Sequence, residues 1–278
     1  MPAAKRPSAS ATREGWKGWD TYAPFYDWEN ARTVGRKDVA FWRQLARHTP
    51  GRLLELGCGT GRIALPPARD GRSLVGIDRS EPMLERAATR AEALRKRRGG
   101  RAKQRLSLIR GDIRALPFGD EEFAAVLAPY GILQSLVRDR DLAATIASVA
   151  RVLEPGGIFG IDLVPDVPNW KEYSNRIQMR GRASGGRHLT LVESVRQDRK
   201  RGLTIFEQAY IERRGKQVTR HTFDLTFRTV PIKRMTRRLE RAGFIIEALL
   251  GDYRGAEWDE RADVWIILAR KAPAQASL

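Results

Sequence analysis

The sequence is poor in cysteine and histidine and has no long hydrophobic run. Its 278 residues hold one cysteine, Cys58, so neither an internal disulfide nor a cysteine-based zinc cluster can form. The three histidines form no His-x-His pair, and no metal site is predicted. No apolar stretch reaches the roughly 18 residues of a transmembrane helix, and residues 1–20 lack the apolar core of a secretory signal. These absences lead us to expect a cytoplasmic protein without membrane association.

The balance of charges is strongly positive. Lysine and arginine number 51 against 33 acidic residues, which gives a net charge of +18. Such an excess is typical of a solvated basic surface, and it also favours an anionic partner such as nucleic acid, a phosphorylated metabolite or acidic lipid. Hydrophobic residues make up 42% of the chain, which excludes a wholly disordered protein.

Short apolar strands alternate with helical patterns in the first two thirds of the chain. Strands are predicted at 53–56, 74–77, 106–109, 123–127 and 158–163. Helices are predicted near 35–47, from about residue 60, over 80–96 and over 139–153. This alternation is typical of an α/β fold with a doubly wound, Rossmann-like parallel sheet.

The pattern then changes to a period of two. Apolar residues alternate with polar ones over 189–195, 203–211 and 221–227, which predicts an antiparallel β sheet inserted in the main fold as a lid. A helix at 232–242 and strands at 244–250 and 262–269 follow. We therefore predict a disordered basic arm at 1–18, a main domain from 19–165 plus 232–270, an acceptor-binding insertion at 166–231, and a flexible tail at 271–278.

A glycine-rich turn follows the first strand, in the run Leu53-Leu-Glu-Leu-Gly-Cys-Gly-Thr-Gly-Arg62. Glycines allow close approach to a ligand and backbone angles that other residues avoid. A dinucleotide fingerprint requires G-x-G-x-x-G, but here the third glycine is Gly61 and position 62 is arginine. The spacing present, acidic-x-G-x-G-x-G, resembles motif I of class I methyltransferases that use S-adenosylmethionine.

Three further features strengthen this resemblance, which covers about residues 50–165. Asp78 ends the second strand, where a carboxylate can accept ribose hydroxyl hydrogens. Asp112 follows the third strand, where the family places an acid facing the adenine amino group. The run Ala150-Arg-Val-Leu-Glu-Pro-Gly-Gly157 is similar to the family's segment before the fifth strand.

The resemblance implies S-adenosylmethionine as the cofactor, with S-adenosylhomocysteine as its product. The implied cofactor-binding positions are Tyr22, Tyr26, Glu55, Gly57, Cys58, Gly59, Gly61, Asp78, Arg79, Met83, Asp112, Ile113 and Pro129. The role of Glu55 and Gly61 in the motif can also be structural. Cys58 is interpreted as a small packed residue rather than a nucleophile.

The corner Ala128-Pro-Tyr-Gly131 follows the fourth strand, where the family places the transferable methyl group and the acceptor. Adenine-N6 enzymes carry Asp or Asn, two prolines and an aromatic residue here, whereas this chain has one proline and no preceding Asp or Asn. Enzymes that make 5-methylcytosine need a later catalytic cysteine, which is absent. The corner and the aromatic segment around Tyr22 and Tyr26 look like those of small-molecule methyltransferases. Tyr130 and His221 are the candidate catalytic groups, and His221 is alternatively a core residue.

The predicted function is methyl transfer to a small-molecule acceptor, at nitrogen or oxygen, by in-line displacement. The closest pattern is that of sugar-amine and glycine N-methyltransferases. The basic surface leaves an anionic acceptor open, and an RNA methyltransferase is the alternative enzyme. A binding protein that holds S-adenosylmethionine without turnover is a third interpretation. A homodimer also remains open, because related lids often form part of a dimer contact.

Overall fold

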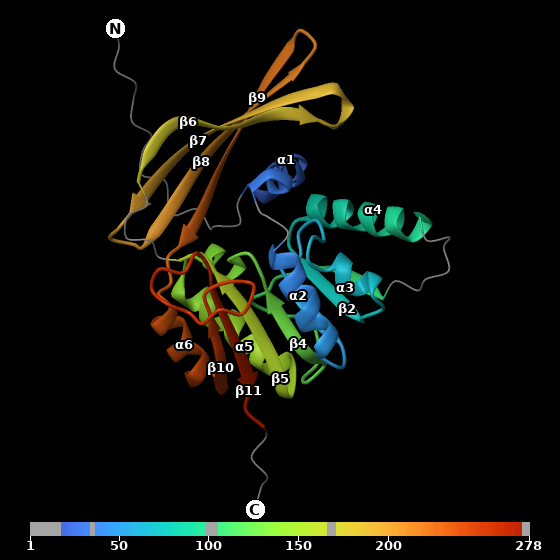
Figure 1. The fold of residues 1–278 in the computed structure, drawn as a ribbon, viewed down its shortest axis with the longest axis vertical. Helices are drawn as coiled ribbons and strands as arrows, with labels where there is room; N and C mark the ends of the chain where they lie inside the picture. Colours follow the sequence, from blue (N-terminus) through green and yellow to red (C-terminus); the bar gives the residue numbers. More distant parts are fainter. Residues whose placement is uncertain (1–17, 34–36, 98–104, 166–170, 274–278) are drawn as a thin grey trace, which may run out of the picture.

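Two separate sheets organise the molecule (Figure 1). The computed structural model describes residues 18–33, 37–97, 105–165 and 171–273. Nearly all of the predicted arm and most of the predicted tail therefore lie outside the described residues. Within the described part of the chain, no helix is long and apolar enough to cross a membrane.

The larger sheet has seven strands in the order β10-β11-β5-β4-β1-β2-β3. The strands are β1 Leu53–Leu56, β2 Leu74–Asp78, β3 Leu106–Arg110, β4 Phe123–Ala128, β5 Leu153–Leu163, β10 Phe244–Leu250 and β11 Trp265–Lys271. Strands β1 to β5 run parallel, and β11 lies antiparallel to both of its neighbours, β5 and β10. The strand order reverses between β1 and β4, the switch point at whose carboxyl ends open α/β sheets bind ligands.

Helices cover both faces of this sheet. They are α2 Lys37–His48, α3 Leu65–Arg69, α4 Glu81–Arg97, α5 Asp139–Val152 and α6 Ile232–Arg241. Leu54 and Val126 share one hydrophobic cluster with buried residues of α5 and α6. Leu53 and Ala125, one residue earlier along each strand, pack with Ala46 of α2 instead. Every residue of β1 and β4 is buried because both faces of these strands are covered, and Glu55 is the one polar residue among them.

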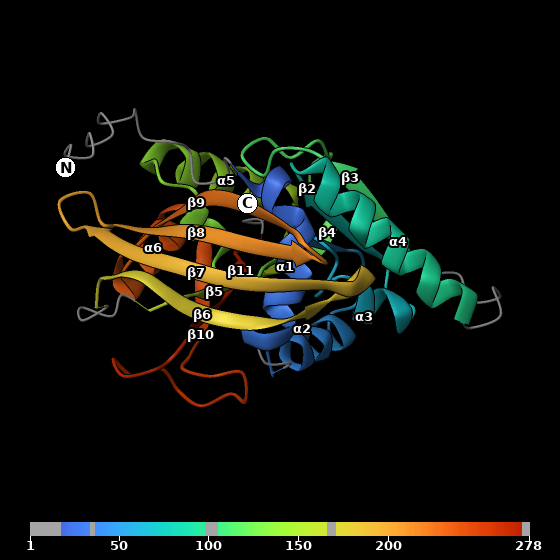
Figure 2. The same cartoon turned by 90° about the horizontal axis from the view of Figure 1, so that it is seen from above.

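The second sheet is antiparallel in the order β6-β7-β8-β9. Its strands are β6 Tyr173–Ala183, β7 Arg187–Asp198, β8 Leu203–Arg214 and β9 Gln217–Arg228, with a short 3-10 turn, η2 Ser184–Gly186, between the first two. This four-stranded sheet, called the lid below, crosses above the main sheet with helix α1 (Trp19–Thr33) between them (Figures 1 and 2). A doubly wound sheet with an inserted antiparallel lid is thus confirmed.

Three elements differ from what the sequence leads us to expect. The aromatic segment forms the helix α1, although Pro24 lies inside it. Its apolar residues do not mark one face, because Phe25 packs on the lid while Tyr26 faces the main domain. Strand β6 is also not predicted from the sequence, since it is an edge strand in which seven of the eleven residues are exposed and none is buried. Finally, β5 begins at Leu153, so the predicted Pro155 turn falls within an irregular part of the strand.

Candidate active site

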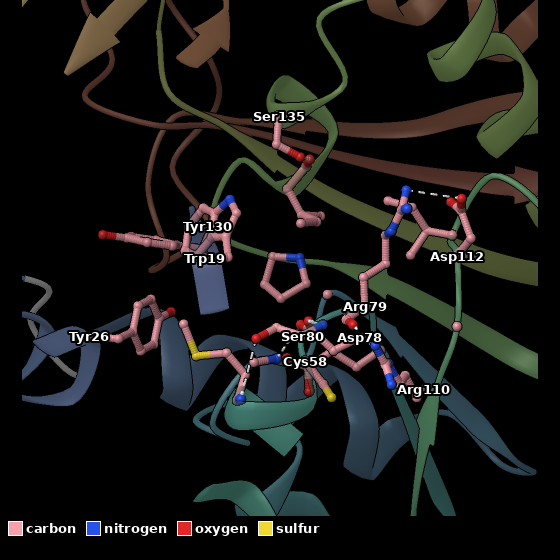
Figure 3. Close-up of a pocket in the computed structure, with 18 of the residues that line it drawn as sticks. Trp19, Tyr26, Cys58, Asp78, Arg79, Ser80, Arg110, Asp112, Tyr130 and Ser135 are labelled. Atoms are coloured by element: carbon pink, nitrogen blue, oxygen red, sulfur yellow. Dashed lines mark hydrogen bonds and ion pairs between the residues drawn. The ribbon is translucent and has the colours of Figure 1, made fainter. Parts of the chain in front are cut away.

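A cavity of about 690 Å³ opens at the carboxyl ends of β1 to β4, beneath α1 and the lid. The predicted site residues that line it are Tyr26, Glu55, Gly57, Cys58, Gly59, Asp78, Arg79, Met83, Asp112, Ile113, Pro129 and Tyr130. Figure 3 shows Trp19, Tyr26 and Tyr130 gathered on one side, called the aromatic end below. Asp112 and Arg110 lie on the other side, which also holds Arg79 and is called the arginine end.

The glycine turn forms the floor of the cavity. Gly57 and Gly59 both have left-handed backbone angles, with φ of 61° and 51°. A Cβ on Gly57 would lie 2.5 Å from Cδ1 of Ile132, so no side chain fits there. The turn is held from β2, because the Cys58 N–H donates to the Ile77 carbonyl at 3.1 Å. Burial raises the pKa of the Cys58 thiol, which keeps it neutral and unreactive.

Asp78 joins the glycine turn to the start of α4. Its two carboxylate oxygens accept the Gly59 and Ser80 N–H groups, each at 2.8 Å. Burial raises the pKa of this carboxyl, and the two N–H donors oppose that rise. Asp78 therefore presents a fixed carboxylate at the centre of the cavity wall, with lone pairs left for further donors.

Asp112 is the acid of the arginine end. Arg114 donates to both of its oxygens, with the shortest contact at 2.7 Å, and Arg79 donates to Oδ2 at 3.1 Å. Burial alone would raise its pKa, but the Arg114 hydrogen bonds and the charge of Arg79 outweigh burial and lower it. The resulting fixed anion is surrounded by cations, of which Arg110 is paired with Glu81 at 2.7 Å.

Glu55 carries an unsatisfied buried oxygen. The side chain is 2% exposed, and its Oε2 has no hydrogen-bond partner among the described residues. Burial raises its pKa to about 8, against the opposing charge of Arg62. A buried carboxyl without a full set of donors is costly unless it is protonated or meets a cation. Glu55 therefore offers a site for a positively charged ligand group.

The aromatic end is held by Arg62. Its guanidinium carbon lies 5.3 Å from the centroid of the Tyr130 ring, and its Nη1 is 2.5 Å from the buried Asp38. Burial raises the pKa of Tyr26 to about 12, although Arg62 lowers it, and burial raises that of Tyr130 well above its ordinary value. Both tyrosines are therefore neutral hydroxyls near pH 7, able to donate a hydrogen bond but not to act as bases.

Three of the predicted site residues do not line this cavity. Tyr22 packs in the cluster between α1 and the lid, and its hydroxyl donates to Glu29 at 2.5 Å. His221 lies on β9, with its ring 5.0 Å from Phe25 and its Nε2 3.8 Å from Glu212. Gly61 turns the chain toward α3, where a Cβ would press on Leu65 and Ala87. The structure thus places these three residues in packing contacts outside the lining of this cavity.

Several lining residues were not predicted. Arg62, Ser80 and Arg110 lie next to motif positions, so a broader reading of each motif could have found them. Trp19 comes from α1, Ser135 from the short helix η1 (Ile132–Ser135), and Phe227 from the end of β9. No local motif marks the last two, and Phe227 reaches the cavity only through the packing of the lid.

Comparison with known proteins identifies the central part of the chain. Residues 53–157 match the model of a methyltransferase domain. A putative methyltransferase from Bacillus subtilis, YqeM, is 30% identical over 143 residues, a match that covers 51% of this chain and 50% of that protein. The chain thus spans about half the length of this curated relative.

Solved structures extend the similarity of fold to the lid. CcbJ methyltransferase from Streptomyces caelestis has a TM-score of 0.72 at 19% identity, covering 91% of this chain and 97% of its own. The sugar N-methyltransferase KedS8 from Streptoalloteichus has a TM-score of 0.69 at 17% identity, covering 96% and 98%. These TM-scores establish a shared fold for nearly the whole chain.

Proposed function

We infer, from the premise that residues 53–157 form a class I methyltransferase domain, that the chain transfers a methyl group from S-adenosylmethionine to a small molecule. We propose a nitrogen atom as the acceptor. The observation that carries the proposal is that the glycine turn, Asp78 and Asp112 line the same cavity as the aromatic end. The described residues that define the aromatic end, Trp19, Tyr26 and Tyr130, include no evident base.

The residues of the cavity fit the cofactor. The unsatisfied Oε2 of Glu55 suits the ammonium group of its methionine part. Asp78 retains lone pairs for ribose hydroxyls, and the left-handed turn at Gly57 and Gly59 leaves the backbone bare of side chains. Asp112 and Ile113 line the arginine end, where the adenine would lie.

When bound, the cofactor supplies an electrophilic methyl group on a sulfonium, so the hard chemistry is its own. The chain's residues bind, orient and exclude water. Tyr26 and Tyr130 close the aromatic end, and the lid contributes Phe227 above them. Fixed orientation of two reactants can lower the barrier by as much as about 7–11 kcal/mol.

The tyrosine pKa values favour nitrogen over oxygen. A hydroxyl acceptor usually needs a base, whereas an amine attacks in its neutral form. The raised pKa values of Tyr26 and Tyr130 prevent either from acting as a base near pH 7. Asp20 also lines the cavity, next to Trp19 in the chain, and its charge acts on Asp78. Similarity in fold to KedS8, a sugar N-methyltransferase, supports an amine of a small molecule.

The test is turnover of S-adenosylmethionine with matched amines and alcohols, including amino sugars and their hydroxyl counterparts. We expect S-adenosylhomocysteine to form with an amine, and mass analysis to locate the new methyl group on nitrogen. A methyl group on oxygen or carbon would contradict the choice of atom. Tight cofactor binding without turnover on any acceptor would instead support the non-catalytic alternative.

The net charge of +18 favours one alternative acceptor, an RNA. Its test is RNA affinity measured at several salt concentrations, because each phosphate contact steepens the fall of log K with log salt. Weak binding that does not change with salt would exclude it. A homodimer and a cytoplasmic location stay predictions, which sedimentation and localisation of the tagged chain would check.

A further inference from the structure

The corner that carries Tyr130 has an unusual backbone. Tyr130 and Gly131 both adopt left-handed angles, with φ of 58° and 62°. A non-glycine residue rarely adopts this conformation, and surrounding structure must hold it there. Tyr130 is nevertheless 41% exposed, toward the aromatic end of the cavity, so its own ring packing does not provide the whole restraint.

A buried carboxylate supplies the restraint from the neighbouring strand. Asp162 lies at the end of β5 and is 1% exposed. Its Oδ1 accepts the N–H of Gly131, which follows the end of β4, at 2.8 Å. The next residues are tied as well, since the Gln134 amide bonds both the N–H and the carbonyl of Val164, at 2.8 and 3.0 Å.

The second oxygen of Asp162 reaches a distant part of the chain. Its Oδ2 accepts the hydroxyl of Tyr253 at 2.8 Å. Tyr253 belongs to the connection between β10 and β11, and its ring centroid lies 5.9 Å from that of Phe41 on α2. Asp162 therefore links three elements, and neither Asp162 nor Tyr253 lines the cavity itself.

We propose that Asp162, supported by Tyr253, is the positioning residue that sets the Tyr130 ring at the aromatic end of the cavity. The expected effect on turnover rests on the proposed function. The expected effect on the position of the Tyr130 ring does not, because it can be measured without an acceptor. Asp162 acts through the main chain of Gly131 and touches neither substrate nor cofactor.

The ionisation of Asp162 should control this arrangement. Burial raises its pKa to about 6, opposed by the Gly131 N–H and the Tyr253 hydroxyl. The remaining charged groups that face it are Asp38 on α2, which raises the pKa, and Arg62, which lowers it. Above about pH 6 the carboxylate accepts both hydrogen bonds. Below that pH the carboxyl is neutral. A proton on Oδ2 can be donated to the Tyr253 hydroxyl, which reverses that bond, and the Gly131 N–H is left with a neutral oxygen, a weaker acceptor than a carboxylate.

The test is NMR of the full chain labelled with ¹³C-tyrosine. The chain has six tyrosines, and the Tyr130→Phe variant assigns the Tyr130 signal by its absence. We expect this signal to shift with a midpoint near pH 6 in the wild type and to lose that titration in Asp162→Asn. Tyr253→Phe removes a donor to the carboxylate, so the midpoint should rise, by about one unit. Asp70→Asn, at a surface ion pair with Arg43, should titrate as the wild type does.

A second measurement separates this role from a merely structural one. Affinity for S-adenosylhomocysteine in Asp162→Asn should stay within about threefold of wild type, while kcat for the fastest amine acceptor should fall by roughly ten- to hundredfold. In Tyr253→Phe, the acid limb of the plot of kcat against pH should shift to higher pH together with the NMR midpoint. A Tyr130 signal that does not titrate, or that titrates equally in Asp162→Asn, would overturn the inference. If no acceptor is ever turned over, the proposed function fails, and the NMR result still decides the role of Asp162.

Discussion

The main sheet and the lid bury their surfaces by different means. Strands β1 and β4 are covered on both faces by aliphatic side chains, and hydrogen bonds from main-chain N–H groups to Asp78 and Asp162 fix the loops at their ends. The lid has one covered face, where aromatic rings of α1 and the sheet surround a polar cluster. In that cluster, Glu29 accepts the hydroxyls of Tyr22 and Tyr210.

This difference between the main sheet and the lid divides the cavity into two halves that are built in different ways. The half of the cavity around Gly57, Asp78 and Asp112, where we propose that the cofactor binds, is formed by short-range turns at the ends of β1, β2 and β3, and is called the cofactor half. The other half, at the aromatic end where we propose that the acceptor binds, is called the acceptor half. It is formed where α1, η1 and the lid meet, so it depends on contacts between distant segments. Changes in the first half should therefore act on cofactor affinity, and changes in the second on stability or turnover.

The largest expected effect lies in the glycine turn. In Gly57→Ala the new Cβ would meet Ile132 at 2.5 Å while the residue stays left-handed. Strain and overpacking together should cost about 2–5 kcal/mol. Thermal unfolding and calorimetry with S-adenosylhomocysteine should both show the loss. The matched control is Gly71→Ala, where φ is 90° but no atom lies within 4 Å, so only the backbone cost should appear. Equal losses in the two variants would contradict the close approach at Gly57.

The next effect concerns Asp78. Replacing it with alanine removes a charged acceptor of ribose hydrogen bonds, which should weaken cofactor binding by about 1.5–3 kcal/mol. Calorimetry with S-adenosylhomocysteine measures this directly. Asp70→Ala serves as control, because that acid pairs with Arg43 and Arg47 outside the cavity. Unchanged affinity in Asp78→Ala would show that the ribose lies elsewhere.

The lid should respond in the opposite way. Tyr210→Phe removes a buried hydroxyl that donates to Glu29, so the free energy of unfolding should fall by about 1–3 kcal/mol. Burial raises the pKa of Glu29, and the Tyr210 hydrogen bond opposes that rise, so the variant also leaves this acid less satisfied. Denaturant unfolding gives the loss, and cofactor affinity should change by less than about twofold. A large loss of affinity with intact stability would remove the distinction between the two halves.

The smallest expected effect is the release of a proton from Glu55 when the cofactor binds. Because burial raises the pKa of Glu55 from 4.5 to about 8, the native state holds a proton that the unfolded chain releases. The stability contributed by this group therefore falls as pH rises from about 4.5 to 8. At pH 7 a cationic ligand group beside Glu55 should lower its pKa and release up to about one proton. Calorimetry of S-adenosylmethionine binding in buffers of different ionisation enthalpy measures this release, and Glu55→Gln should show less.

The sequence allowed most of the cofactor half to be predicted, because its residues follow strand ends in fixed order. Gly57, Asp78 and Asp112 are each recognisable within a few neighbouring residues, and all three line one cavity. The rest depends on long-range packing. Phe227 reaches the cavity only when the lid folds over it, and no local pattern relates Asp162 to Gly131 or Tyr253.

Long-range packing also decides where residues lie that the structure places differently from the sequence prediction. Tyr22 and Tyr26 are one turn apart on α1, and the sequence treats them alike. Tyr26 faces the cavity, whereas Tyr22 faces Tyr210 and Phe223 of the lid. The face of a helix that lies between two layers cannot be assigned until both layers are known.

The most direct test of cofactor binding in this cavity is a crystal structure of the full chain grown with S-adenosylmethionine. We expect density with the methionine part over the turn at 57–61, the ribose at Asp78 and the base at the arginine end. Density for the compound in any other place, or an unchanged cavity at saturating concentration, would contradict it.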